Sequence, residues 1–266
     1  MKIDKIISVS SFAIHGAASL KLLLAKYGKY ILPVPSALFT ALTNNPLYQK
    51  FELPLAEILQ STLKIAQSKE QKIILHIGYL SSPQQVEVIL QSYNDYKNSI
   101  IAIVVDPVMG DNGKWYVDPN LLPAWQQLVS IANFATPNFT ELKLLLNFDA
   151  DAEVEMETLL PLFKQKFPSC NLIVTSVPNV IHQEIYVHTQ HEEFALHFPK
   201  HNCIMGGTGD LFTGTFIVQK YIKQKPLEIA LQNSHRTVSK AISKALKNQK
   251  TEMFVIFFFV LLCLFG

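Results

Sequence analysis

The sequence predicts an α/β fold in which a central, mostly parallel sheet carries helices on both faces. Short runs rich in β-branched residues alternate with longer segments of helical periodicity. Such alternation is typical of parallel strands joined by helical crossovers. Residues 100–105 are unbroken apolar sequence, as expected for a strand covered on both faces. The length of 266 residues and the 49% hydrophobic content suit one large domain, or at most two small ones.

The first half of the chain is expected to hold four strands, each followed by a helix. The strands are expected at residues 3–10, 30–34, 72–77 and 100–105, and the helices at 17–27, 54–67, 82–93 and 121–131. Leu20, Leu23 and Leu24 give the first helix one apolar face. The second strand is expected to be short, because Pro33 and Pro35 interrupt it.

The second half repeats this pattern and then ends in helices. Strands are expected at 132–135 and 172–177, helices at 140–146 and 153–167, an antiparallel hairpin at 184–189 and 193–198, and long helices at 211–222 and 227–246. Several histidines fall in or near the hairpin, namely His188, His191, His197 and His201. They either belong to a cover over a ligand or face solvent. The predicted domain spans residues 1–248, and residues 249–266 form an apolar tail.

The most informative motif is a glycine-rich turn that leads into one carboxylate, with the sequence MGGTGDLFTG at residues 205–214. Glycine lets the backbone come close to a ligand, and the first N–H groups of the next helix have no partner within it. Gly207, Thr208 and Gly209 are therefore predicted to form an anion site, with Asp210 as a proton acceptor beside it. An anion site next to a base is what phosphoryl transfer to a hydroxyl requires. A glycine-rich helix cap with an incidental aspartate is the alternative.

Polar residues follow several of the predicted strands. They are Ser10, Ser11, Gly78, Tyr79, Asp106, Asp111, Thr136, Asn138, Glu141, Thr175 and Ser176. Parallel sheets bind ligands beyond the carboxyl ends of their strands, so these residues are expected to share one site. Asp106, Asp111 and Glu141 offer the hard oxygen ligands that Mg²⁺ prefers, directly or through water, against nucleotide phosphates. Taken singly, residues such as Asp106 and Asn138 could instead be turn or helix caps.

Three segments in order resemble signatures of the pyridoxal kinases, within the ribokinase-like superfamily. They read DPVMGDNGKWYV at residues 106–117, TPNFTEL at 136–142 and GTGDLF at 207–212. The resemblance implies a ribokinase-like fold and ATP-dependent phosphorylation of the 5′-hydroxyl of pyridoxal, pyridoxine and pyridoxamine. It also implies Mg²⁺ with ATP, a monovalent cation and a homodimer. Residues 14–20 depart from some members of the family, which carry an asparagine in this glycine turn.

The resemblance also assigns roles to individual residues. Asp210 becomes the catalytic base, with Gly207, Thr208 and Gly209 as the anion hole. The substrate would contact Ser11, Pro46, Leu47, Tyr79 and Asp210, and Tyr48 would also border its pocket. ATP would contact Asp106, Asp111, Thr136, Asn138, Glu141, Thr175, Ser176 and the Gly207–Thr208–Gly209 turn. The metal would be held by Asp106 and Glu141.

Two other functions stay open. Hydroxymethylpyrimidine (phosphate) kinases of thiamine synthesis resemble the chain at the same segments, but many carry a cysteine where Asp210 stands here. The Gly110-Asp111 pair also favours vitamin B6. The other alternative is a degenerate kinase that binds pyridoxal phosphate without turnover.

The amino-acid composition limits which binding partners and which cellular compartment are expected. The net charge of +2 and the lack of a basic block argue against nucleic acid. The cysteines form no CxxC pair, and no signal peptide is evident, so a cytoplasmic protein is expected. Residues 253–265 are unbroken apolar sequence, shorter than the ~17–25 residues of a spanning helix. A membrane is therefore not the expected partner, although a buried strand, an aberrant end and a short membrane tail all remain open for this segment.

Overall fold

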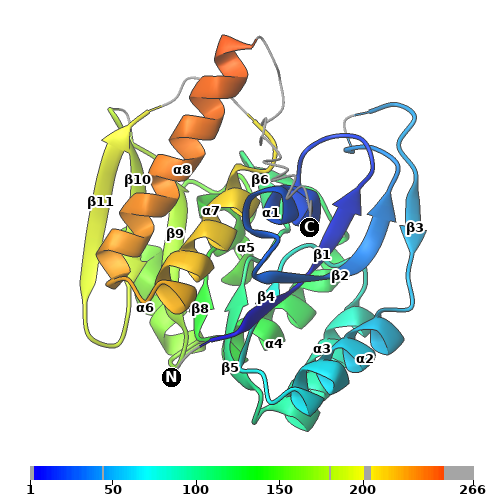
Figure 1. The fold of residues 1–266 in the computed structure, drawn as a ribbon. Helices are drawn as coiled ribbons and strands as arrows, with labels where there is room; N and C mark the ends of the chain where they lie inside the picture. Colours follow the sequence, from blue (N-terminus) through cyan, green and yellow to red (C-terminus); the bar gives the residue numbers. More distant parts are fainter. Residues whose placement is uncertain (1–2, 44, 180, 201–204, 249–266) are drawn as a thin grey trace, which may run out of the picture.

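The computed structural model describes residues 3–43, 45–179, 181–200 and 205–248 of the chain. One sheet of nine strands runs through these residues. The strands are β1 (Lys5–Ala13), β2 (Ile31–Phe39), β3 (Lys50–Glu52), β4 (Ile73–Ile77), β5 (Ile100–Val105), β8 (Phe134–Ala135), β9 (Asn171–Val177), β10 (His182–His188) and β11 (Glu193–Pro199). They lie side by side in the order β11-β10-β9-β8-β5-β4-β1-β2-β3 (Figure 1). A separate ribbon pairs β6 (Gly110–Asp111) with β7 (Lys114–Trp115).

The centre of the sheet is parallel and its edges are antiparallel. Every neighbouring pair from β9 through β8, β5, β4 and β1 to β2 is parallel. The β10–β11 hairpin closes one edge, and β3 pairs antiparallel with β2 at the other. The predicted mostly parallel sheet is confirmed, and all six central strands end on the same side.

Helices cover both faces of this sheet, as predicted. They are α1 (Ser19–Tyr27), α2 (Leu55–Ser68), α3 (Pro83–Tyr96), α4 (Leu122–Ile131), α5 (Phe139–Leu145), α6 (Met156–Lys166), α7 (Thr208–Ile217) and α8 (Leu227–Lys247). One core contains buried residues of α2 to α6, including Leu59, Trp125 and Phe163. The other contains buried residues of α1, α7 and α8, which lie in front of the sheet in Figure 1. Each large apolar side chain buried in these layers contributes about 1.5–3 kcal/mol to folding.

The two helices that reach the carboxyl edge on the front face pack very closely. A Cβ added to Gly214 of α7 would lie 2.2 Å from Leu23 Cδ2 of α1. The Leu23 side chain would have to move to make room for any other residue here. The glycine therefore lets α1 and α7 pack closely, and the starts of both helices contribute to the site described below.

One expectation for the first half was wrong. The second strand does not end at its prolines but runs through Pro33 and Pro35 to Phe39. Proline cannot donate to a neighbouring strand, so it is tolerated where its nitrogen faces a sheet edge. Here β3 pairs with β2 only from Ala37 onward, which leaves Pro33 and Pro35 on an open edge.

Two helix starts also differ from the expected positions. The first helix begins at Ser19 rather than at residue 17, after a turn in which Gly16 adopts a φ of +100°. The helix after the glycine motif begins at Thr208 rather than at 211, with Gly207 at a φ of +82° as its cap. Asp210 therefore lies inside the first turn of α7, where the N–H groups without helical partners also lie.

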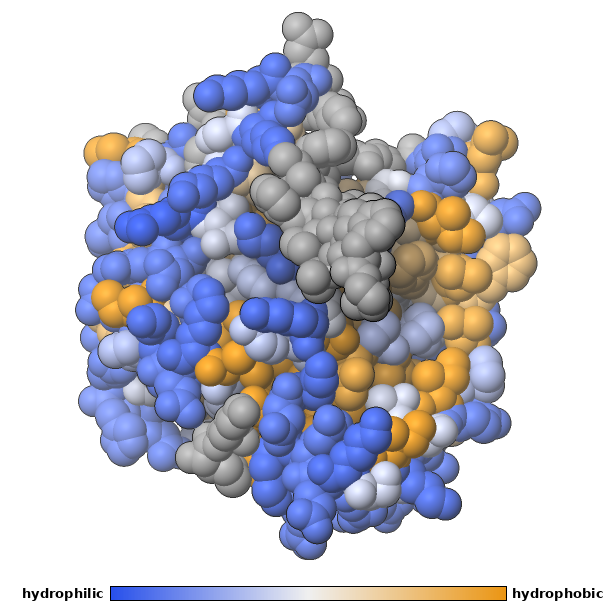
Figure 2. Space-filling view, viewed as in Figure 1, coloured by the Kyte–Doolittle hydropathy of each residue, from blue (hydrophilic) through white to orange (hydrophobic). Residues whose placement is uncertain are grey.

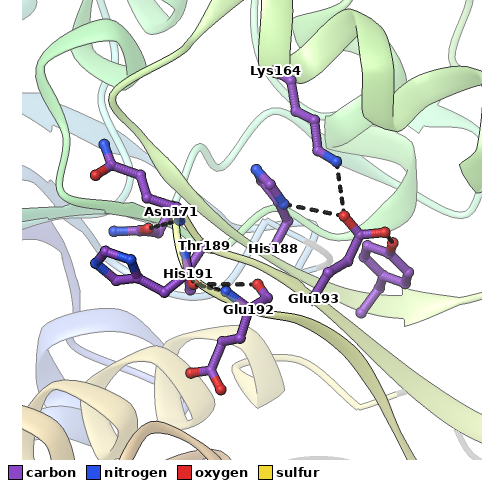
Figure 3. Close-up of polar contacts among 9 residues, drawn as sticks. Lys164, Asn171, His188, Thr189, His191, Glu192 and Glu193 are labelled. Carbon is purple, nitrogen blue, oxygen red and sulfur yellow. Dashed lines mark hydrogen bonds and ion pairs between the residues drawn. The ribbon is translucent and has the colours of Figure 1, made fainter.

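Polar contacts anchor the edge hairpin to the helix behind it. Glu193 of β11 lies 2.8 Å from Lys164 Nζ of α6 and 3.3 Å from His188 Nδ1 of β10, and it accepts a hydrogen bond from Tyr186 (Figure 3). At the hairpin turn, Thr189 Oγ1 accepts from the backbone N–H groups of His191 and Glu192. His188 thus contacts Glu193 within the hairpin through its side chain, and His191 contributes its backbone N–H to the turn. His201 lies outside the described residues.

The surface differs between the two sides of the view. Hydrophilic residues dominate over α8, whereas hydrophobic ones gather on the side of β2 and β3 (Figure 2). Ile14, Leu47 and Phe51 are among the exposed hydrophobic residues. Within the described residues no helix is both long and apolar enough to cross a membrane. The apolar segment at 249–266 lies outside the described residues.

Candidate active site

A cavity of about 740 Å³ opens at the carboxyl ends of the central strands. After β1 the chain first forms β2 on one side and later β4 on the other, so the strand order reverses beside β1. Parallel sheets bind ligands at such a point. Most predicted site residues line the cavity, namely Ser11, Tyr79, Asp106, Asp111, Thr136, Asn138, Glu141, Thr175, Ser176, Gly207, Thr208, Gly209 and Asp210.

The N-terminus of α7 forms one wall of this cavity. The first helical hydrogen bond runs from Leu211 N to Gly207 O at 3.0 Å, so the N–H groups of Thr208, Gly209 and Asp210 have no acceptor within the helix. The helix dipole adds partial positive charge at this end. A Cβ added to Gly209 would lie 3.9 Å from Asp106 Oδ2, which shows how close the helix start lies to that carboxylate. The wall can thus receive an anion.

Two buried carboxylates face this wall, and a third, partly buried one belongs to the wall itself. Asp106 follows β5, Glu141 lies in α5, and Asp210 lies in α7. Burial, reinforced by the charge of Asp210, raises the pKa of Asp106 to about 8. Burial, with the charge of Asp106 second, raises the pKa of Glu141 well above its ordinary value, and burial raises that of Asp210. Like charges this close favour either protonation or a bound cation.

The Glu141 carboxylate is fixed by two backbone N–H groups. Its Oε2 accepts from Asn138 N at 2.9 Å, and its Oε1 accepts from Met109 N at 3.1 Å. Asn138 Oδ1 in turn accepts from Glu141 N at 2.9 Å, which completes a capping box at the start of α5. The TPNFTE segment therefore has two structural roles. Its capping box starts α5, and the same Glu141 carboxylate is held against the loop after β5.

Asp106 and Glu141 form a donor set that suits Mg²⁺. No group of three His, Cys, Asp or Glu side chains in the described part of the chain is arranged to hold a metal on its own. Mg²⁺ does not need such a cage, because it usually keeps several waters and takes one or two carboxylates plus phosphate oxygens. Two buried carboxylates with raised pKa values, beside an anion wall, fit that pattern.

The remaining polar residues line the same end of the cavity. Asp111 Oδ1 accepts from Asn112 N at 2.8 Å in the tight β6–β7 turn, and burial raises its pKa. The hydroxyls of Thr136 and Thr213 lie 2.9 Å apart and connect β8 to α7. Ser176 follows Thr175 with a φ of +57°, an uncommon conformation for a residue other than glycine.

The opposite end of the cavity is aromatic. Phe39 of β2 packs edge-to-face against Tyr48 and Tyr79, each with 5.2 Å between ring centroids. Burial, and then the nearby Tyr48 and Glu52, raises the pKa of Tyr79 to about 12, so its hydroxyl stays protonated at neutral pH. Ala13 and Leu42 also line this end. It can hold a flat, mostly apolar ring.

Two predicted substrate contacts lie elsewhere. Pro46 and Leu47 are exposed and do not line the cavity, and Leu47 is 83% exposed. The chain reverses here, with Tyr48 N donating to Asn45 O and Leu47 N to Asn45 Oδ1. This turn directs Tyr48 into the cavity and leaves the two preceding residues outside. Tyr48, which the resemblance also sets beside the substrate, does line the cavity. Phe39 and Leu42 were not predicted, since their apolar character alone fits any core position.

Ser19 is a further site residue that the sequence did not single out. It is buried at the start of α1, where its N–H donates to Asp210 Oδ2 at 2.9 Å. Its Oγ accepts from Ser11 Oγ at 3.0 Å. Ser19 falls inside the helix expected at 17–27, so its position gave no hint of a contact with a residue so far along the chain. Among the described residues, no histidine of the hairpin lines the cavity.

The model of one protein family, described as phosphomethylpyrimidine kinase, matches residues 25–255. The chain belongs to the phosphomethylpyrimidine kinase family. It is also similar to curated pyridoxal kinases, at 25% identity over 226 residues for that of Arabidopsis thaliana, which covers 80% of this chain and 73% of the relative. A Schizosaccharomyces pombe protein provisionally assigned as a pyridoxal kinase is 28% identical over 151 residues, which cover 53% of this chain. The resemblance to pyridoxal kinases is confirmed.

The sequence matches cover only part of several relatives, whereas the solved structures superpose over nearly the whole chain. In three yeast relatives the match spans only 44%, 38% and 61% of the relative's length. Pyridoxal kinase from Entamoeba histolytica superposes with a TM-score of 0.80 at 21% identity, covering 96% of this chain and 93% of its own. That from Lactobacillus plantarum gives 0.80 at 19% identity, covering 94% and 91%. These structures establish the ribokinase-like fold.

Proposed function

We propose that this protein is a kinase that transfers the γ-phosphoryl group of ATP to the 5′-hydroxyl of pyridoxal, and also of pyridoxine and pyridoxamine. The observation that carries the proposal is the placement of the Asp210 carboxylate among the N–H groups of α7 that have no acceptor within the helix. The aromatic end of the same cavity offers space for a pyridine ring. Related folds have been solved with AMP-PNP and PL, and with ADP and pyridoxine, which supports the same pair of ligands here.

In the proposed reaction Asp210 is the base. It takes the proton of the substrate hydroxyl as that oxygen bonds to the γ-phosphorus and the bond to the β-phosphate oxygen breaks. A positioned base contributes about 10²–10⁴-fold to the rate. The N–H groups of Thr208, Gly209 and Asp210 stabilise the charge on the migrating group, and losing one such donor typically costs about 3–4 kcal/mol. Thr136, Asn138, Thr175 and Ser176 complete the proposed nucleotide site.

The raised pKa values at this end suit a site that binds its cation together with the nucleotide. Asp106 and Glu141 would hold Mg²⁺, and Asp111 would help to place it or the phosphates. The ion, when bound, supplies positive charge to the phosphate oxygens. Asp106 and Glu141 then no longer need protons to remain buried, because a cation replaces the protons that burial favours. A monovalent cation, a homodimer and a cytoplasmic location stay predictions.

Phosphorylation of a hydroxymethylpyrimidine is the second candidate, favoured by the description of the matching family. Its substrate is also a flat ring with a primary hydroxyl, so the same cavity suits it. Asp210 at the base position favours the B6 vitamers, because many of those pyrimidine kinases resemble this chain except for a cysteine there. A binding protein without turnover is disfavoured by the intact Asp210 and Glu141.

A coupled assay of ADP release decides between these candidates. The purified protein is supplied with ATP, Mg²⁺ and, in parallel, pyridoxal, pyridoxine, pyridoxamine or hydroxymethylpyrimidine. We expect turnover with the B6 vitamers and formation of the 5′-phosphates by mass spectrometry. Turnover with the pyrimidine alone would replace the proposal by the second candidate, and vitamer binding without turnover would favour the binding protein.

A further inference from the structure

Asp210 is held by a residue that is distant in sequence and has no assigned role. Ser19 donates its backbone N–H to Asp210 Oδ2 at 2.9 Å, and its side chain gives the same carboxylate a second hydrogen bond. A carboxylate fixed through one oxygen presents its other oxygen in a defined direction. The contact joins the start of α1 to the start of α7, the two helices that Gly214 keeps in close contact.

The backbone of Ser19 adopts a conformation that favours glycine. Its φ is +48°, and such a conformation costs a non-glycine residue about 1–3 kcal/mol unless its surroundings enforce it. The enforcing contacts are present, because Ser11 of β1 donates its hydroxyl to Ser19 Oγ at 3.0 Å. Ser11, Ser19 and Asp210 thus form a chain of hydrogen bonds that runs from the buried sheet edge to the proposed base.

We propose that Ser19 is a positioning residue for Asp210. Its N–H, turned toward α7 by the left-handed backbone, aims the carboxylate at the reacting hydroxyl, and the bond from Ser11 keeps it turned. The inference rests on the proposed function only in taking Asp210 as the base. Its central geometric claim, that residue 19 sets the direction of the Asp210 carboxylate, is independent of the substrate.

Two substitutions at this position separate the N–H group from the hydroxyl. Ser19→Ala removes both hydroxyl contacts, and the backbone N–H bond to Asp210 alone must then hold the left-handed conformation, so the N–H should turn away from Asp210. Ser19→Gly also lacks the hydroxyl but adopts a positive φ without strain, so the N–H can stay in place. Glu70→Ala is the matched control, because exposed Glu70 has a φ of +53° at the end of α2, outside the cavity.

We expect Ser19→Ala to lower kcat by about tenfold or more, since misplacement by about 1 Å can cost 10²-fold. The KM for ATP should change by less than about twofold, because the nucleotide contacts remain. Ser19→Gly should recover most of the lost kcat, and Glu70→Ala should leave kcat unchanged despite a similar backbone penalty. Thermal melting of each variant shows whether it is folded.

The result that would overturn the inference is a Ser19→Ala kcat equal to that of the parent, or a Ser19→Gly kcat as low as that of Ser19→Ala. Crystal structures of the parent and Ser19→Ala give a readout without turnover. The Asp210 carboxylate should rotate or shift in the variant, and an unmoved carboxylate would contradict the inference. Lack of any vitamer turnover in the parent would refute the proposed function, whereas the position of Asp210 would still decide the role of Ser19.

Discussion

The two ends of the cavity are built in opposite ways. The acidic end consists of strand ends, a capping box and a helix start, with buried Asp106 and Glu141 beside the partly buried Asp210. The aromatic end consists of Phe39, Tyr48 and Tyr79, which pack as any small core does. Burial works against the carboxylates, as their raised pKa values indicate, whereas burial of the rings stabilises the fold. The proposed reacting groups thus lie where burial disfavours their charged forms. The proposed contacts to the substrate ring lie where burial stabilises the fold.

The strongest test of the acidic end is Asp210→Asn. The amide keeps the shape and can still accept from Ser19 N–H, but it cannot take a proton, so kcat should fall by about 10²–10⁴-fold. The KM for ATP should stay within about threefold, since only the base is lost. Steady-state kinetics measure both. Asp95→Asn, on the exposed side of α3, is the control, and a variant as active as that control would remove Asp210 from its proposed role.

The acidic end should make the free energy of unfolding depend on pH. Asp106 stays protonated in the folded protein up to about pH 8, whereas it ionises near its ordinary pKa of 3.8 in the unfolded chain. Between these values the folded state binds more protons, so this group's contribution to stability is lost as pH rises. Asp106→Asn should therefore raise the free energy of unfolding more at pH 8 than at pH 5, by on the order of 4 kcal/mol. Urea unfolding of the metal-free proteins measures this, and an equal effect at both pH values would contradict the assigned shift.

The metal assignment is tested by Glu141→Gln. The amide keeps one acceptor for the capping box but loses the charge, so the Mg²⁺ concentration for half-maximal activity should rise by about tenfold, an effect of about 1.4 kcal/mol. The measurement is a Mg²⁺ titration at saturating ATP and vitamer. An unchanged Mg²⁺ requirement with a lowered melting temperature would make Glu141 a helix-capping residue only.

The smallest expected effect lies at the aromatic end. Tyr79→Phe keeps the ring contacts with Phe39 and removes only the hydroxyl, whereas Tyr79→Leu removes the aromatic pair, worth about 0.5–1.5 kcal/mol. The KM for the vitamer should rise several-fold in Tyr79→Leu and much less in Tyr79→Phe, with kcat little changed in both. Larger losses in kcat than in KM would show that this end takes part in the chemistry.

The acidic end of the cavity could be predicted from the sequence more fully than the aromatic end. The acidic end follows from local rules, because strand ends, a capping box and a glycine-rich helix start place Asp106, Glu141 and Asp210 within short segments. The aromatic end depends on how the turn at 45–48 folds back, so of the neighbouring Pro46, Leu47 and Tyr48 only Tyr48 lines the cavity. Ser19 meets Asp210 only through the packing of α1 on α7, which no single segment reveals. The length of β2 could not be predicted either, because it depends on Pro33 and Pro35 lying at an open edge of the sheet.

The most direct test of the central claim is a crystal structure of the protein with AMP-PNP, Mg²⁺ and pyridoxal. We predict that the 5′-hydroxyl lies within about 2.6–3.2 Å of an Asp210 carboxylate oxygen, with the γ-phosphate at the N–H groups of α7. A carboxylate that points away from both ligands would contradict the account.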